Sequence, residues 1–127
     1  MKKIITTNKA PGAIGPYSQA TCVDRFIFTS GQLPIDPASG KFAGTTVSVQ
    51  TRQSLENIRS ILEAEGISMN SVVKTTVFLS DMDNFAEMNK VYGEFFSEGA
   101  YPARSAVEVA RLPKDALVEI EAVAVKN

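Results

Sequence analysis

Apolar residues repeat at helical spacing in residues 47–65, where they fall on a single stripe. Thr45 or Thr46 can cap the start of this segment, because a threonine hydroxyl accepts from the free N–H groups of a first turn. Gly66 lies where a helix C-terminus favours glycine. The pattern predicts an amphipathic helix over 47–65.

A second helical stripe follows an aspartate-rich segment. Asp81 or Asp83 can cap it, and Gly99 can end it. The apolar members of the stripe are Phe85, Met88, Tyr92, Phe95 and Phe96. Their spacing predicts a second amphipathic helix.

Short runs rich in β-branched and aromatic residues predict strands at 2–6, 21–23, 26–30 and 71–79. The intervening segment NKAPGAIGPYSQA carries two prolines and two glycines, which favour a shaped loop over a regular element. The segment IDPASGKFAGT has the residues of a surface turn.

The segment PARSAVEVARLPKDALVEIEAVAV, residues 102–125, predicts a β-hairpin. One face of its second strand is uniformly apolar and consists of Val118, Ile120, Ala122 and Ala124. The other face mixes Leu117, Val123 and Val125 with Glu119 and Glu121. The first strand begins with an arginine, Arg104, so the hairpin places two carboxylates and a cation among aliphatic side chains.

The order of elements predicts an α+β domain in which both helices cover the same face of one sheet. The helices would bury the uniformly apolar face and leave the mixed face uncovered. An uncovered apolar sheet face often marks an interface, so we expect another copy of the chain to pack there. No linker, repeat or low-complexity tract interrupts residues 1–127, which we interpret as one domain.

Composition narrows the class of protein. With 127 residues, 44% hydrophobic and 21% charged, the chain is long and apolar enough to bury one core. The net charge of −1 and the absence of a basic run disfavour a nucleic-acid binder. No window approaches a membrane span, and the apolar run near the N-terminus is too short for a signal peptide. We therefore expect a cytoplasmic protein.

The chain has one cysteine, Cys22, and no histidine. The Ser-His-Asp and Cys-His arrangements of nucleophilic enzymes are therefore excluded, and so is the commonest zinc ligand. We expect no metal site. Proton transfer near neutral pH must depend on carboxylates, lysine, tyrosine, backbone groups or bound water.

Two interpretations of Arg104 are open. Paired with Glu119 or Glu121, it would form a structural ion pair across the hairpin or between subunits. In a ligand site, its guanidinium would bind a carboxylate with two hydrogen bonds while one glutamate held a water. The residues by themselves favour the ion pair, because such networks are common.

Four other positions are weaker candidates by themselves. Tyr17, after Gly15-Pro16, is expected to be half-buried with its hydroxyl satisfied. Ser30 and Gly31 end a strand, where a bulge could free a backbone N–H for an anion, although a plain turn is commoner. Asn89, on the second helix, is expected to be exposed.

Several segments together resemble the RidA family, also called YjgF/YER057c/UK114, of reactive intermediate deaminases. These segments are APGAIGPYSQA, FTSGQLPID, VVKTTVFLSDM, FAEMNKVYGEFF and PARSAVEVARLPKDALVEIEAVAV. They follow one another over essentially the whole chain, in the order and with the spacing of the family.

This resemblance implies a chorismate-mutase-like α+β subunit with a mixed sheet and two helices on one face. It further implies a homotrimer whose sheets form a barrel, with clefts between neighbouring subunits. The implied reaction is hydrolysis of 2-iminobutanoate and 2-iminopropanoate to 2-keto acids and ammonia. Pyridoxal-phosphate dehydratases release these imines, and the hydrolysis itself requires no cofactor.

Carried over by position, the resemblance implies two catalytic residues, Arg104 for the substrate carboxylate and Glu119 for the attacking water. The implied substrate-binding positions are Tyr17, Ser30, Gly31, Asn89, Arg104 and Ala106. The family usually has a cysteine where this chain has Ala106. Alanine serves if that position acts through its backbone. A role that depends on the thiol, such as redox regulation, is in doubt for this chain.

Two other functions stay open. The same cleft could bind a keto acid or an amino acid without catalysis and regulate a partner protein. Some relatives are credited with RNA cleavage or inhibition of translation. The near-neutral charge and the absence of histidine disfavour that alternative.

Overall fold

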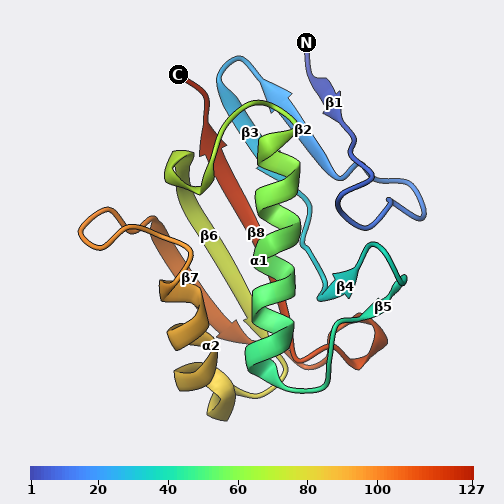
Figure 1. Ribbon diagram of the computed structural model, residues 1–127, viewed down its shortest axis with the longest axis vertical. Helices are drawn as coiled ribbons and strands as arrows, with labels where there is room; N and C mark the ends of the chain where they lie inside the picture. The colour runs from blue at the N-terminus through green and yellow to red at the C-terminus, as the bar shows by residue number, and fades with distance from the viewer.

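The computed structural model describes residues 1–127 and contains a six-stranded mixed sheet with two α-helices on one of its faces (Figure 1). The strand order is β1-β2-β3-β8-β6-β7, and a separate pair, β4-β5, lies beside it. The predicted α+β class and the placement of both helices on one face are confirmed. Neither helix is both long and apolar enough to cross a membrane.

The strands are β1 (Lys3–Ile5), β2 (Ala20–Val23), β3 (Phe26–Thr29), β4 (Ile35–Asp36), β5 (Lys41–Phe42), β6 (Val72–Leu79), β7 (Ala103–Glu108) and β8 (Val118–Val125). The helices are α1 (Val47–Glu63) and α2 (Phe85–Gly93), with short 3-10 turns at Met69–Ser71, Met82–Asn84 and Pro113–Asp115.

Helix α1 begins where its cap predicts. The hydroxyl of Thr46 accepts from the N–H of Val49 at 3.2 Å. The helix ends at Glu63, two residues earlier than the apolar stripe predicts. Gly66 then takes a left-handed φ of 75°, and the next N–H, of Ile67, returns to the carbonyl of Leu62. Glycine therefore terminates the helix, as expected.

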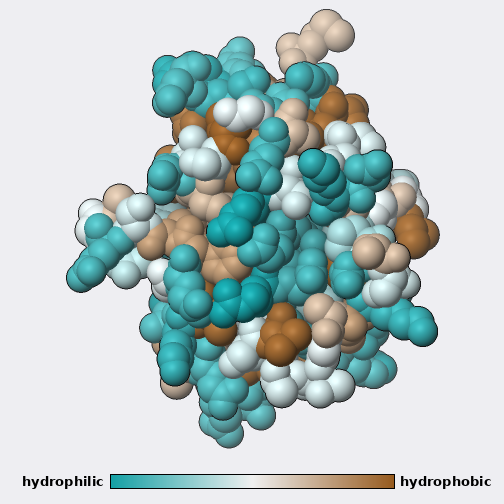
Figure 2. All heavy atoms as spheres, viewed as in Figure 1, coloured by the Kyte–Doolittle hydropathy of each residue, from teal (hydrophilic) through white to brown (hydrophobic).

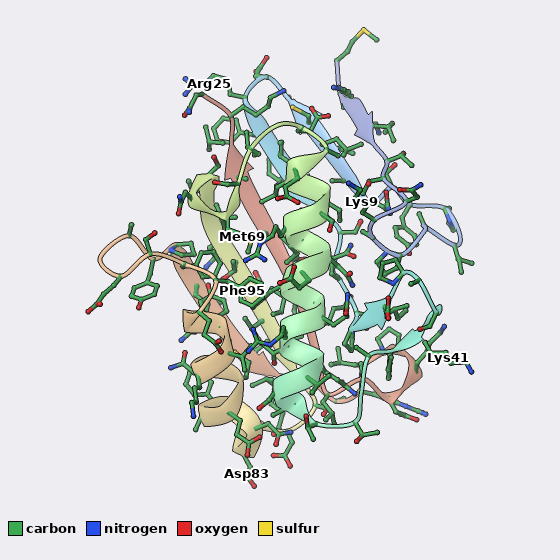
Figure 3. All side chains as sticks on the ribbon, viewed as in Figure 1. Lys9, Arg25, Lys41, Met69, Asp83 and Phe95 are labelled. Atoms are coloured by element: carbon green, nitrogen blue, oxygen red, sulfur yellow. The ribbon has the colours of Figure 1, made fainter.

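Helix α2 is shorter than its stripe predicts. Asp81 caps the 3-10 turn before the helix, not the helix itself. Phe95 and Phe96 lie beyond its last residue but are buried all the same. Phe95 lies next to α1, with the guanidinium of Arg59 4.7 Å from its ring (Figure 3). The apolar stripe thus predicts burial correctly but overestimates the length of the helix.

The predicted hairpin over 102–125 is wrong. Strand β6 lies between β7 and β8, parallel to β7 and antiparallel to β8. The segment β6-α2-β7 is a βαβ unit, whose helix packs on the sheet while the chain returns to start a parallel strand. Residues 109–117, with a 3-10 turn, then carry the chain past β6 to β8. The pairing is decided by the crossover, which local strand patterns do not reveal.

The covered face of the sheet forms the core. Val118, Ile120, Ala122 and Ala124 are at most 3% exposed, which confirms the predicted buried face. The stripe of α1 packs in the same cluster through Leu55, Ile58, Ile61 and Leu62, all 0% exposed. Burial of this apolar surface holds the helices on the sheet.

The opposite face of the sheet is uncovered and carries several large apolar side chains among charged and polar ones. Figure 2 shows the side that carries α1, where hydrophilic atoms predominate. On the uncovered side, the rings of Phe26 and Phe28 stack at 6.4 Å, and both remain nearly half exposed. Val23, Val73 and Val107 are similarly exposed. The prediction of an uncovered apolar face holds for Val123 and Val125, but Leu117 packs against the core.

One ion cluster joins both chain ends to Glu65, two residues after the end of α1. The carboxylate of Glu65 accepts from Lys3 at 3.0 Å and from Lys126 at 3.3 Å, and its side chain is only 7% exposed. Burial raises the pKa of Glu65, but the hydrogen bonds and charges of the two lysines outweigh it, and the net pKa is lowered.

We expect Glu65→Gln to lower the free energy of unfolding at neutral pH by on the order of 1 kcal/mol, a discounted value because Lys3 is exposed. The pKa of Glu65 is lower in the folded state than in the unfolded state. The ion cluster therefore makes its full contribution to the free energy of unfolding at pH values above the unfolded-state pKa, and this contribution disappears as the pH falls through the folded-state pKa. Denaturant unfolding at several pH values measures it. Glu63→Gln is the control, because Glu63 is exposed and has no ion-pair partner. Equal losses in both variants, or a loss independent of pH, would contradict the prediction.

Candidate active site

The candidate residues form two groups. The glutamate half-site consists of Tyr17, Ser30, Gly31 and Glu119. The arginine half-site consists of Arg104 with three residues of α2, namely Phe85, Asn89 and Tyr92.

The two half-sites lie on opposite faces of the sheet. Arg104 is opposite Thr75 in the β6-β7 ladder, and Thr75 is buried on the face that the helices cover. Glu119 is opposite Phe78, which lies on the other face because its neighbours on β6 are buried in the core. Directly paired residues share a face of a sheet. One chain therefore cannot bring Arg104 and Glu119 to the same small ligand.

Arg104 has no carboxylate partner in the chain. Its Nη1 donates to the Asn89 side-chain oxygen at 2.6 Å, while Nε and Nη2 donate to no group of the protein. The guanidinium carbon lies 5.3 Å from the Phe85 ring centroid and 4.7 Å from that of Tyr92. The ion pair with Glu119 or Glu121 that the residues favour is therefore wrong within one chain, because the side chains point to opposite faces.

A cavity of about 470 Å³ opens beside this arginine. Its lining consists of Asn89, Tyr92, Gly93, Tyr101, Pro102 and Arg104. The free edge of the guanidinium offers parallel N–H donors, which match the two oxygens of a carboxylate. The arginine half-site is thus suited to a small carboxylic acid.

Sequence reasoning missed the part that Tyr92 plays here and counted it only as an apolar stripe residue. Tyr92 is 4% exposed, and its hydroxyl hydrogen-bonds to the Thr75 hydroxyl at 2.6 Å. Burial raises the pKa of Tyr92 although the Thr75 hydrogen bond and the Arg104 charge oppose the rise. The signal was available, because Phe85, Asn89 and Tyr92 recur at i, i+4 and i+7 on one face of the helix.

In the glutamate half-site, Ser30 and Gly31 lie at a bulge. Phe28 pairs with Val123, but Gln32 pairs with Ile120, so the segment that continues β3 has one residue more than β8 at this point. The Gly31 N–H donates to no group of the chain. The plain turn that was favoured for these two residues is therefore wrong, and the alternative, a bulge with a free N–H, is present.

Gly31 also makes room for Glu119. A Cβ built on Gly31 would lie 2.9 Å from the Glu119 carboxyl carbon and closer still to one carboxylate oxygen. The Glu119 carboxylate thus lies directly over the backbone of the bulge. This contact distinguishes Glu119 from Glu121, which the residues by themselves left as an alternative.

The electrostatics of Glu119 suit a proton acceptor. Burial raises its pKa above the ordinary value of 4.5, and the nearby charge of Glu121 raises it further. Glu119 makes no ion pair in the chain, so its oxygens remain available to a water. A carboxylate with a raised pKa is a stronger base in its ionised form.

The loop that carries Tyr17 is held by Gln19. The side-chain amide of this buried glutamine donates to the carbonyls of Thr7 and Pro11, at 2.9 and 2.7 Å. The hydroxyl of Ser30 donates to the Ser18 carbonyl at 2.5 Å. Tyr17 is 52% exposed, close to the expected half burial, but its hydroxyl has no hydrogen-bond partner in the chain, so the expectation of a satisfied hydroxyl is wrong. Tyr17 and Ser30 instead line a common cavity of about 570 Å³.

The remaining positions fall on the arginine side. Asn89 is exposed, as expected, yet it contacts Arg104. Ala106 pairs with Val77 and packs partly buried against the core, on the same face as Arg104. No group of three histidine, cysteine, aspartate or glutamate side chains in the structure could hold a metal ion.

Known proteins share this fold over essentially the full chain. A family model described as Endoribonuclease L-PSP matches residues 7–126. The RutC family protein PH0854 of Pyrococcus horikoshii is 57% identical over 127 residues, with both chains completely covered. The 2-iminobutanoate/2-iminopropanoate deaminase of Salmonella typhimurium is 52% identical over 129 residues, also with both chains completely covered. The crystal structure of Escherichia coli TdcF with bound serine matches at a TM-score of 0.92 and 48% identity, over 98% of this chain and 99% of that chain.

The fold and the two half-sites define a small α+β domain with an unpaired arginine beside a cavity, which suits a small carboxylic acid. The chain belongs to the family described as Endoribonuclease L-PSP, and the resemblance to RidA proteins is confirmed.

We expect the pKa of Glu119 to lie above the ordinary value of 4.5. The chemical shift of its carboxyl carbon, followed by NMR through a pH titration, measures this pKa. Glu121→Gln should lower that pKa by removing a like charge, but only in part, because burial is the larger cause. Glu63→Gln removes a remote charge and serves as the control. A Glu119 pKa unchanged in Glu121→Gln would show that the two carboxylates do not interact.

Proposed function

We propose that the protein hydrolyses 2-iminobutanoate and 2-iminopropanoate to the 2-keto acids and ammonia. The observation that carries the proposal is the Arg104 guanidinium, which is held in place but has no carboxylate partner and keeps its Nε and Nη2 donors free. Relatives at about 50% identity bear the name of this activity. The serine in TdcF is a small amino acid whose carboxylate adjoins the nitrogen-bearing carbon, as in a 2-imino acid.

We further propose that residues 1–127 act as one domain in a homotrimer whose sheets form a barrel, with the active sites in the clefts between subunits. The opposite orientation of the two half-sites supports this arrangement, because Arg104 of one copy can meet Glu119 only on another copy. Strand β7, which carries Arg104, is an edge strand and so is accessible to a neighbour. The uncovered apolar face offers the surface that such an assembly would bury.

In this site, Arg104 binds the substrate carboxylate through two parallel N–H donors. The free N–H of Gly31 on the neighbouring copy donates to the same carboxylate. Tyr17 and Ser30 line the adjoining cavity and Asn89 holds the guanidinium. The substrate is thereby fixed with C2 next to Glu119, and such positioning lowers the barrier by several kcal/mol.

Glu119 holds a water beside C2 of the protonated imine. A bond forms between the water oxygen and C2, the C=N π pair moves to nitrogen, and Glu119 takes a proton from the water. The product is a carbinolamine. Glu119 then returns the proton to nitrogen, the C2–N bond breaks and the hydroxyl proton passes to Glu119, which gives the keto acid and ammonia. Glu119 finally releases this proton to ammonia or to solvent and is again a carboxylate. Carboxylate assistance of this kind contributes roughly a hundredfold.

The physiological role that follows is removal of the imines that pyridoxal-phosphate dehydratases release in the cytoplasm. None of these steps uses a side chain at position 106, and Ala106 lies against the core, so replacement of the family cysteine leaves the mechanism complete.

The proposal predicts that the protein removes 2-iminobutanoate made in situ by a threonine dehydratase, and thereby lowers its capture by semicarbazide. Arg104→Ala should reduce kcat/KM roughly 100-fold, because a charged partner of the substrate is lost. Arg111→Ala is the matched control. Arg111 is 79% exposed and pairs only with Asp115, so full activity is expected. Semicarbazone formation that the wild-type protein does not change would refute the deaminase and favour a non-catalytic binding protein.

A site shared between copies predicts complementation. Arg104→Ala and Glu119→Gln should each be inactive, but coexpressed chains should form mixed trimers. Every mixed trimer contains one cleft with an intact arginine and an intact glutamate, so random mixing restores about a quarter of the wild-type activity. Isolation through two different tags verifies the mixing. Mixed trimers as inactive as either parent would contradict a shared site.

The description of the family model makes RNA cleavage the second candidate. The chain has no histidine for a ribonuclease site, and its net charge of −1 gives little attraction to phosphate. Ribonuclease activity that co-purifies with the protein and is lost in Arg104→Ala would favour that candidate over the deaminase.

A further inference from the structure

One face of α2 is directed at Arg104. Phe85, Asn89 and Tyr92 occur at i, i+4 and i+7, positions that fall on the same side of a helix. All three contact the guanidinium group of Arg104, Asn89 by a hydrogen bond and the two rings through their faces. The helix therefore surrounds the end of this arginine over two successive turns.

The ring of Tyr92 is immobilised by its own contacts. Its hydroxyl bonds to Thr75, the β6 residue that is directly opposite Arg104 in the parallel ladder. The ring of Phe96, a buried core residue, packs against the Tyr92 ring with the two ring centroids 4.8 Å apart. Phe85 is partly buried and packs against the same core. Both aromatic residues thus join the guanidinium to the rigid part of the fold.

The geometry points to Phe85 and Tyr92 as positioning residues that hold the Arg104 guanidinium in the orientation that receives a carboxylate. With Nη1 occupied by Asn89, the rings leave the Nε and Nη2 edge as the open pair of donors. A free arginine side chain must give up much rotational freedom when it binds. The aromatic contacts remove that freedom beforehand, which favours binding without touching the ligand.

This inference rests on the proposed function for its natural substrate, but its test does not require turnover. The probe is 2-oxobutanoate, whose binding is measured by isothermal titration calorimetry. Phe85→Leu removes the ring and keeps an apolar side chain, whereas Phe85→Tyr keeps the ring face. We expect Phe85→Leu to weaken binding roughly 3- to 10-fold, within the range of a cation–π contact, and Phe85→Tyr to bind within about twofold of wild type.

Kinetics with 2-iminobutanoate separate positioning from general damage. Arg104 contacts the carboxylate both before and during the reaction, so Phe85→Leu should raise KM by a similar factor with kcat nearly unchanged. A fall in kcat with unchanged KM, or equal effects of leucine and tyrosine at position 85, would overturn the inference. So would wild-type affinity for 2-oxobutanoate in Phe85→Leu.

The two proposals fail separately. If Phe85→Leu weakens binding of 2-oxobutanoate and Phe85→Tyr does not, but the wild-type protein has no deaminase activity, the positioning role is upheld and the proposed enzyme activity is refuted. If the wild-type protein is a deaminase but both variants at position 85 bind 2-oxobutanoate equally well, the enzyme activity is upheld and the positioning role is refuted. If Phe85→Leu does not fold, NMR of the wild-type protein without ligand provides the test. Slow rotation about the Nε–Cζ bond of Arg104 supports the inference, and free rotation overturns it.

Discussion

Successive side chains of a β-strand point to opposite faces of the sheet, and this alternation separates Arg104 from Glu119. Strand β6 fixes the relation, because it pairs with both strands that carry these residues. The cation therefore emerges among the helices and the carboxylate on the uncovered face. A one-residue change in the register of β8 against β6 would turn Glu119 and Glu121 into the core. The position of the site thus depends on the same pairing that builds the sheet.

The crossover through α2 explains why the arginine is so well supported. A βαβ unit lays its helix over the strands it joins, so the residues of α2 that face the sheet also reach the edge strand β7. Three of them contact Arg104. On the other side of the sheet, support comes from backbone geometry, namely a bulge and a missing Cβ at Gly31. One half-site depends on packed side chains and the other on main-chain shape.

The sequence allowed the local features to be predicted, but not those that depend on distant pairing. Thr46 and Gly66 marked the ends of α1 closely, because capping is a matter of neighbouring residues. Alternation along 118–124 identified the buried face. The hairpin was mispredicted because the partner of β7 is β6, across an entire helix. Family resemblance points to Arg104 and Glu119, yet it does not indicate that one chain directs them to opposite faces. The helical stripe predicts that Phe85 and Tyr92 belong to the core, but not that their rings contact Arg104.

The stacked rings of Phe26 and Phe28 have a consequence for biosynthesis. A chain that has just left the ribosome presents them, with Val73 and Val107, as a sticky surface in a crowded cell. While that surface is uncovered, the chain is prone to adhere to other proteins and is a target for chaperones. Any partner that covers this surface would therefore lower the tendency of the chain to aggregate.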